Sequence, residues 1–341
     1  MDPFSPLNFI LFSFGCNFFR KSLWTRVFGW ILFTLHALKA FLPWIKLTRM
    51  LSRLYDDSVS QGVVTTFIWY LDDVFDCLFI SIVVYNRNHY EDILRKLSDK
   101  LTVNERKSLW KLSLFGFLFS VSVPVKDLVS ITQNNDRKLL LIIRNWLMTL
   151  SSIDSFLVCG RIVFCYFIRL VTFEDKRFIQ SIVEQYKSLT PSSVSVEKRR
   201  LQEYRQFVVD KFFVIPVLWF LRELVMLVAV IADTRFARRN PTLFLLTGVM
   251  PAVTSIVAHA FMIFYIDHCV NDVNKELERV TLILAQKDYH KWRSIISEFE
   301  KENRNITTCS MIDINKRTGL SFISNLITLT LLFKQLVSSL H

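Results

Sequence analysis

Long apolar segments, more than any short motif, limit what this chain can fold into. Seven of them recur along 341 residues, separated by basic stretches. Each has roughly 20 residues or more, the length that an α-helix needs to cross the hydrocarbon core of a bilayer. The segments cover residues 23–44, 63–85, 109–130, 145–170, 212–232, 242–265 and 318–340. The sequence therefore predicts an all-α, polytopic membrane protein whose seven transmembrane helices form one domain over residues 1–341.

Composition supports a membrane protein and argues against a nucleic-acid partner. Hydrophobic residues make up 52% of the chain, and 31 residues are phenylalanine. The net charge is +12, a value that nucleic-acid-binding proteins share. Here, however, Lys and Arg lie mostly between the apolar segments, as the positive-inside rule predicts for an ordinary membrane protein. We therefore expect the lipid bilayer, and no nucleic acid, as a partner.

The distribution of Lys and Arg also predicts the orientation. The N-terminal segment and the stretches after the second, fourth and sixth spans together carry 25 of these residues, whereas the alternate stretches carry 9. Basic residues concentrate on the cytosolic side of membrane proteins. The N-terminus is therefore expected inside and the C-terminus outside, which is opposite to the orientation of G-protein-coupled receptors.

No pattern for catalysis, cofactor binding or metal binding is present. The six cysteines contain no CxxC pair, and the six histidines show no metal-ligand spacing such as HExxH. GxSxG, phosphate-binding and dinucleotide-binding glycine motifs are also missing. We therefore expect no enzyme activity, no cofactor and no metal ion.

Two stretches on the predicted inner side, 173–211 and 267–317, are too long to be simple connections. Both are predicted to be helical, and Val273–Phe299 places apolar residues at helical spacing between charged ones. We expect amphipathic helices that extend the spans into the cytosol and pack together there as an anchor. The exception is Leu189–Ser195, whose sequence LTPSSVS has the composition of a linker.

The last apolar segment, Thr318–His341, carries an ordered line of polar residues. Spacings of three and four residues place these side chains on one helical face. The line consists of Ser321, Asn325, Thr328, Gln335 and Ser339, with Leu332 in the remaining position. Lipid cannot satisfy such groups, so the face meets either water or polar neighbouring helices. Periodicity alone favours neither alternative.

This segment resembles the C-terminal helix of insect gustatory receptors, which carries Thr-Tyr, five mostly hydrophobic residues and Gln-Phe. Thr328 precedes Gln335 by the same seven positions, at the same distance from the C-terminus. Seven spans, an inside N-terminus and long inner loops after spans four and six are similar as well. The chain departs from the pattern at Leu329 and Leu336, which replace the two aromatic residues, and at Lys334, which replaces the last hydrophobic residue.

The resemblance implies a tastant-gated, nonselective cation channel in the plasma membrane of chemosensory neurons. In that family four subunits, identical or related, surround a central pore with their seventh helices. The Gln and Phe that close the motif lie at the constriction, and they correspond to Gln335 and Leu336. Asn325, Thr328 and Leu332 are then expected to line the pore. Leu336 would form the apolar ring that closes the gate, while Lys334 would have to point away from the axis.

Ionisable and aromatic residues inside the outer halves of the spans are candidates for the ligand site, because buried charge is costly and often functional. The candidates are Trp69, Asp72, Asp73, Trp146, Asp154 and His259. Such a set suits a polar or cationic organic ligand. The alternative is structural: Asp72, Asp73 or Asp76 pairs with Arg161 or Arg222 and holds the helices together.

Two other classes of function remain open from the sequence. A seven-helix receptor that signals through G proteins would need an outside N-terminus, which the charge distribution opposes. A membrane transporter or scaffold is also possible, although no inverted internal repeat is visible in the sequence.

Overall fold

The structure is a computed structural model of the whole chain. It describes residues 101–116, 153–185, 187–212, 217–224, 249–301, 306–308 and 312–339, with isolated positions between 23 and 34, between 78 and 100, and at 118 and 227. The predicted first and second spans and the outer half of the third therefore lie almost entirely outside the described residues. The number of transmembrane helices, seven, and their orientation in the membrane stay predictions.

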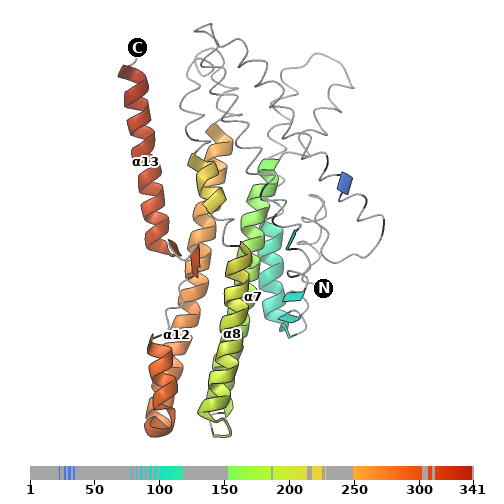
Figure 1. Cartoon of the computed structure of the whole chain (residues 1–341), viewed down its shortest axis with the longest axis vertical. Helices are drawn as coiled ribbons and strands as arrows, with labels where there is room; N and C mark the ends of the chain where they lie inside the picture. Colours follow the sequence, from blue (N-terminus) through green and yellow to red (C-terminus); the bar gives the residue numbers. More distant parts are fainter. Residues whose placement is uncertain are drawn as a thin grey trace.

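The described part of the fold is helical and elongated. Figure 1 shows α7 (Ile153–Gln185), α8 (Pro191–Phe212) and α12 (Met250–Lys301) running roughly along the long axis of the molecule. The most extensive packing between described elements joins α7 and α12. Segment 103–116 lies on another side of α7, where Gly116 allows close approach: a Cβ there would lie 2.5 Å from Cγ2 of Ile162.

One hydrophobic cluster occupies the middle of the molecule. It is built around the central turns of α7, where eight of the nine residues from Ile162 to Leu170 belong to the cluster and are at most 5% exposed. Trp219 and Ile266 face it from segment 217–224 and from α12. A helix buried on nearly all sides is typical of the centre of a helical bundle. This helix therefore forms the axis of the described fold.

The second cluster is formed where α12 turns back on itself. Asp288 has non-helical backbone angles (φ −161°, ψ 82°), and its Oδ1 accepts a hydrogen bond from the backbone N–H of Lys291 at 3.1 Å. Asp288 thus caps a new helical segment. That segment returns Trp292 and Ile295, both fully buried, against the preceding half of α12. We call residues 273–301 the α12 hairpin.

The connection from α7 to α8 is shorter than composition predicts. Pro191 begins α8, so most of Leu189–Ser195 is helical and the linker prediction is wrong beyond Thr190. The reason is local: Thr190 caps the helix, since its Oγ1 accepts from the N–H of Ser193 at 3.3 Å and its own N–H donates to Ser193 Oγ at 3.2 Å. Proline is well suited to the first helical position that follows.

A small β-hairpin interrupts the helices before the C-terminal segment, where the sequence predicted helix throughout 267–317. Strands β1 (Ile306–Thr308) and β2 (Ile312–Ile314) pair antiparallel, with Ile306 opposite Ile314. Short β-branched runs favour strands over helix, which accounts for the difference. The hairpin leads directly into α13 (Lys316–Ser339), as Figure 1 shows at the lower end of that helix.

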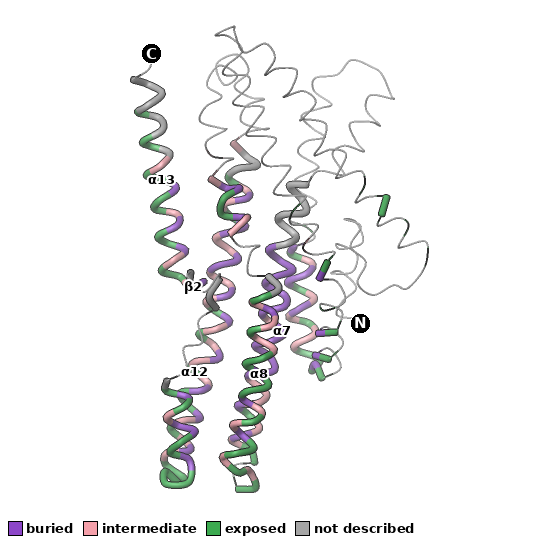
Figure 2. The backbone as a smooth tube through the Cα atoms, in the orientation of Figure 1, coloured by how far each residue is buried: buried purple, intermediate pink, exposed green. Residues whose placement is uncertain are grey.

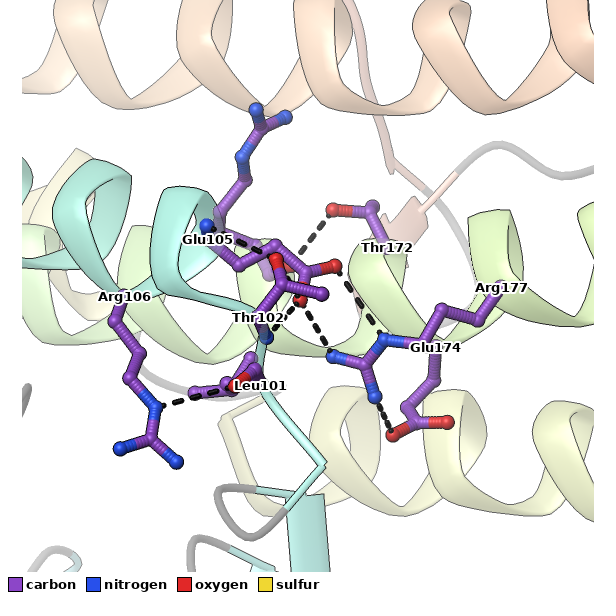
Figure 3. Close-up of polar contacts among 8 residues, drawn as sticks. Leu101, Thr102, Glu105, Arg106, Thr172, Glu174 and Arg177 are labelled. Atoms are coloured by element: carbon purple, nitrogen blue, oxygen red, sulfur yellow. Dashed lines mark hydrogen bonds and ion pairs between the residues drawn. The ribbon is translucent and has the colours of Figure 1, made fainter.

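An ion-pair cluster fixes segment 103–116 to α7 (Figure 3). Thr102 and Glu105 form a capping box, in which Thr102 N–H donates to Glu105 Oε2 at 2.7 Å. Arg177 of α7 donates to both oxygens of Glu105, at 3.0 and 3.4 Å, and to Glu174 Oε1 at 2.7 Å. Burial of Glu105 opposes its charged form, but the hydrogen bonds from Thr102 and Arg177 outweigh burial and lower the pKa of Glu105.

Within the described residues, one helix is long and apolar enough to cross a membrane, judged by length and composition: Val253–Glu300 of α12. Its N-terminal part coincides with the predicted sixth span. The same helix continues without interruption to Asp288, far beyond residue 265.

Candidate functional site

The polar line of the C-terminal helix is exposed in the isolated chain. Ser321, Asn325, Thr328, Leu332 and Gln335 are all exposed along α13. Thr328 satisfies its hydroxyl by donating to the backbone carbonyl of Ser324 at 2.9 Å, so the side chain stays close to the helix. The line is thus continuous over almost four helical turns and faces away from the rest of the described chain.

A second exposed line on α13 is apolar. Leu320, Ile327 and Leu331 are between 52% and 57% exposed. Their spacing of seven and four residues places them beside the polar line on the same helix. A helix with adjoining polar and apolar exposed faces suits a position between a water-filled path and an apolar neighbour, either lipid or another helix. The side chains of Lys334, Leu336 and Ser339 lie outside the described residues.

The first three turns of α13 attach it to the described part of its own chain. Asn315 caps the helix by accepting from the N–H of Thr318 at 2.9 Å, and Lys316 N–H donates to Asp267 of α12 at 3.1 Å. Phe322 and Leu326 are each 5% exposed. Figure 2 shows that the buried positions described on α13 end in its lower half.

A glycine permits this attachment. Gly319 of α13 is buried, and a Cβ added there would lie 2.9 Å from Cγ2 of Ile263. Contacts below 3.0 Å require one of the two groups to shift. The absence of a side chain at residue 319 thus allows α13 and α12 to approach closely at this one crossing.

Behind α13 lies a buried cluster of charged and polar side chains, drawn from three helices. Arg161 of α7 forms an ion pair with Glu223 of segment 217–224, and both side chains are fully buried. The guanidinium carbon of Arg161 also lies 5.4 Å from the ring centroid of Trp219. Charges buried this deeply persist only when paired, so the pair holds α7 against segment 217–224.

Ser255 of α12 lies at the centre of the cluster. Its hydroxyl donates to Glu223 Oε1 at 2.8 Å and accepts from Arg161 Nη2 and Arg222 Nη1, both at 3.1 Å. A hydroxyl has one donor and two acceptor positions, and all three are used here. Among the described residues, Glu223 Oε2 and His259 Nδ1 are buried without a hydrogen-bond partner. The cluster could therefore accept a further polar group.

Sequence reasoning identified part of this cluster but not its pairing. The structural alternative pairs Asp72, Asp73 or Asp76 with Arg161 or Arg222. These aspartates lie outside the described residues, and Arg161 in the structure forms its ion pair with Glu223. Glu223 could be suspected only as an ionisable residue within a span. Ser255 carried no signal, because serine is ordinary in membrane helices and hydrogen bonds readily to its own backbone.

The candidate ligand residues are described only in part. Trp69, Asp72, Asp73 and Trp146 lie outside the described residues, and Asp154 belongs to α7 without a described side chain. His259 is 4% exposed, and its ring centroid lies 4.8 Å from that of Phe322 on α13. Contact of any of these residues with a ligand stays a prediction.

No protein-family model matches the chain, and no curated protein sequence matches it. Its fold is nevertheless similar to solved structures of insect olfactory receptor OR5 from Machilis hrabei. The first superposes with a TM-score of 0.64 at 12% identity, covering 94% of this chain and 91% of that one. The complex of OR5 with eugenol gives 0.63 at 12% identity, covering 98% and 97%. The chain thus shares the fold of an insect chemoreceptor over nearly its whole length.

Proposed function

We propose that this chain is a chemoreceptor subunit that forms a ligand-gated, nonselective cation channel in the plasma membrane. The observation that carries the proposal is α13, a C-terminal helix with an exposed polar line, attached to the rest of the described chain only by its first turns. In a receptor of the shared fold, four such helices would enclose a water-filled path. The resemblance of Thr328 and Gln335 to the gustatory motif makes a tastant the proposed ligand.

The gate is proposed at the outer end of α13. An apolar ring closes a pore by excluding water, and polar groups must face the ions when it opens. Leu336 would supply the ring and Gln335 the polar face, exchanged by a small rotation of the helix. Asn325, Thr328 and Leu332 would line the path below.

The proposed ligand is a small organic molecule with polar or cationic character. OR5 has been solved in complex with eugenol, a small organic molecule. In this chain the candidate contacts combine aromatic rings and carboxylates, which favour hydrogen bonding and cation–π contact. They are Trp69, Asp72, Asp73, Trp146, Asp154 and His259.

The pore assignment is tested by cysteine substitution along α13. The polar-line variants are Asn325→Cys, Thr328→Cys and Gln335→Cys, and the matched controls on the apolar line are Ile327→Cys and Leu331→Cys. In cells that express the receptor, a small cationic thiosulfonate reagent should block ligand-evoked current through the polar-line variants only. The wild type measures the background from native cysteines. Equal block along both lines would contradict a pore lined by this face.

The gate is tested by Leu336→Ala, which removes most of the proposed apolar ring. We expect a larger ligand-free current per receptor at the cell surface. An unchanged current would contradict the assignment of Leu336.

A receptor that signals through G proteins is the second candidate, favoured only by the predicted number of spans. Current evoked by a ligand in excised patches, without added nucleotide or G protein, would exclude it. Epitope tags at each end, probed in intact cells, provide an independent check. An extracellular N-terminus would contradict the predicted orientation.

A further inference from the structure

The attachment of α13 centres on one aromatic side chain. Phe322 is 5% exposed, and its ring centroid lies 4.8 Å from His259 of α12 and 5.0 Å from Phe220 of segment 217–224. Tilted aromatic pairs at these distances contribute about 0.5–1.5 kcal/mol beyond the burial of their area. Phe322 is therefore seated on a platform made by two different helices.

The same two helices carry the buried ion-pair cluster. Glu223 follows Phe220 by three residues, and His259 follows Ser255 by four, so each pair lies on neighbouring turns of one helix. Glu223 and Ser255 hold Arg161 of α7. The contacts thus run without a break from α7, through Glu223 and Ser255, to the platform beneath Phe322.

This chain of contacts is stiff for two physical reasons. Displacing either charge from its partner would leave an uncompensated charge among fully buried groups, which is strongly unfavourable. Protein interiors are also packed as densely as organic crystals, so a shift of one buried side chain moves its neighbours. A movement of α7 at Arg161 cannot therefore be absorbed locally.

We propose that Phe220 and His259 are positioning residues for the C-terminal helix, and that the Arg161–Glu223–Ser255 cluster couples α7 to that helix. Arg161 lies two helical turns from Asp154, the candidate ligand residue on the same helix. Ligand binding near the outer part of α7 would then change the position of α13 through these contacts. This inference rests on the proposed channel function.

A double-mutant cycle tests the coupling. Ser255→Ala removes the hydroxyl at the centre of the cluster, and Phe322→Leu removes the ring while keeping an apolar side chain. Phe299→Leu is the matched control, because Phe299 is 3% exposed but lies in the α12 hairpin, in the second hydrophobic cluster. The half-maximal ligand concentration and the ligand-free current are measured for each variant, normalised to receptor at the cell surface.

Ser255→Ala and Phe322→Leu should each shift the half-maximal concentration by about fivefold or more, in line with coupling between sites. The combined variant should differ from the product of the single effects by about twofold or more, since coupled positions are not additive. Ser255→Ala with Phe299→Leu should be multiplicative. If Ser255→Ala does not reach the surface, Phe220→Leu takes its place in the cycle with Phe322→Leu.

The coupling would be overturned if the shifts in half-maximal concentration for Ser255→Ala and Phe322→Leu simply multiplied in the combined variant. It would also be overturned if Ser255→Ala with Phe299→Leu departed from the product by as much. Either result would leave the proposed channel in place. A wild-type receptor that reaches the surface and gives no current with any ligand tested would instead contradict the proposed function, and the coupling with it. The two failures are thus distinguished by the wild type alone.

Discussion

The Arg161–Glu223 pair allows a quantitative prediction about stability. Glu223→Gln keeps the shape of the side chain and removes its charge, leaving Arg161 and Arg222 beside a neutral group. At an effective dielectric constant of about 20, two unit charges about 4 Å apart attract by about 4 kcal/mol. Removing one partner of a fully buried pair is expected to cost about 3–5 kcal/mol. Both side chains are 0% exposed, so no discount for solvent applies.

The matched control is the same substitution at an exposed pair. On α8, Oε1 of Glu197 lies 2.5 Å from Nη2 of Arg200, and the two side chains are 40% and 47% exposed. Exposed pairs contribute about 0–1 kcal/mol, because water already solvates both charges. Glu197→Gln should therefore change stability little.

The assay is the fraction of the protein that stays monodisperse in detergent after heating, measured by size exclusion of a fluorescent fusion. Glu223→Gln should lower the midpoint clearly, and Glu197→Gln should not. Replacing both members of the buried pair with methionine should restore part of the loss, because apolar pairs of similar volume can substitute for buried ion pairs. Equal midpoints for the two glutamine variants would refute the reasoning.

Two further predictions concern the contact of Glu105 with Arg177 of α7 and the start of α13. The pKa of Glu105 is lower in the folded chain than its value of about 4.5 in the unfolded chain. Ionised Glu105 therefore stabilises the fold fully above pH 4.5, and this stabilisation is lost as the pH falls through the lower pKa of the folded chain. Heat resistance of the wild type should fall with acidification in this range more than that of Glu105→Gln. Gly319→Ala should cost about 1–3 kcal/mol by overpacking against Ile263. Introduced into an Ile263→Ala background, where the clashing methyl group is absent, the same Gly319→Ala change should cost much less. A Gly319→Ala variant as heat-resistant as the wild type would show that α13 and α12 can separate freely.

The fold was predictable where one physical property decides it. The length of the apolar segments was enough to predict a helical chain. The helical spacing of apolar residues between charged ones was enough to predict the long helix that follows the predicted sixth span. The turn at Asp288 and the β-hairpin at Ile306–Ile314 were not, because each depends on a few residues whose capping or pairing competes with a strong helical pattern. The same holds for Thr190, which converts a linker composition into a helix start.

The site was predictable to a lesser degree. The polar line of α13 follows from helical spacing alone, and the structure leaves it exposed. The partner of Arg161 did not follow, because several carboxylates satisfy the same chemistry and only the packing of helices selects Glu223. Phe322 looked like one apolar residue among many, since its role depends on two rings distant in the sequence.

The attachment of α13 at one end has a mechanical consequence. Gln335 lies 13 residues beyond Phe322, which corresponds to about 20 Å along a helix that rises 1.5 Å per residue. A tilt of about 6° at the fulcrum formed by Gly319 and Phe322 would move the far end by about 2 Å. Phe220 and His259, which form the platform beneath Phe322, would need to shift by only a fraction of an ångström to produce this tilt. The helix is thus a lever with its short arm inside the protein and its long arm at the proposed gate.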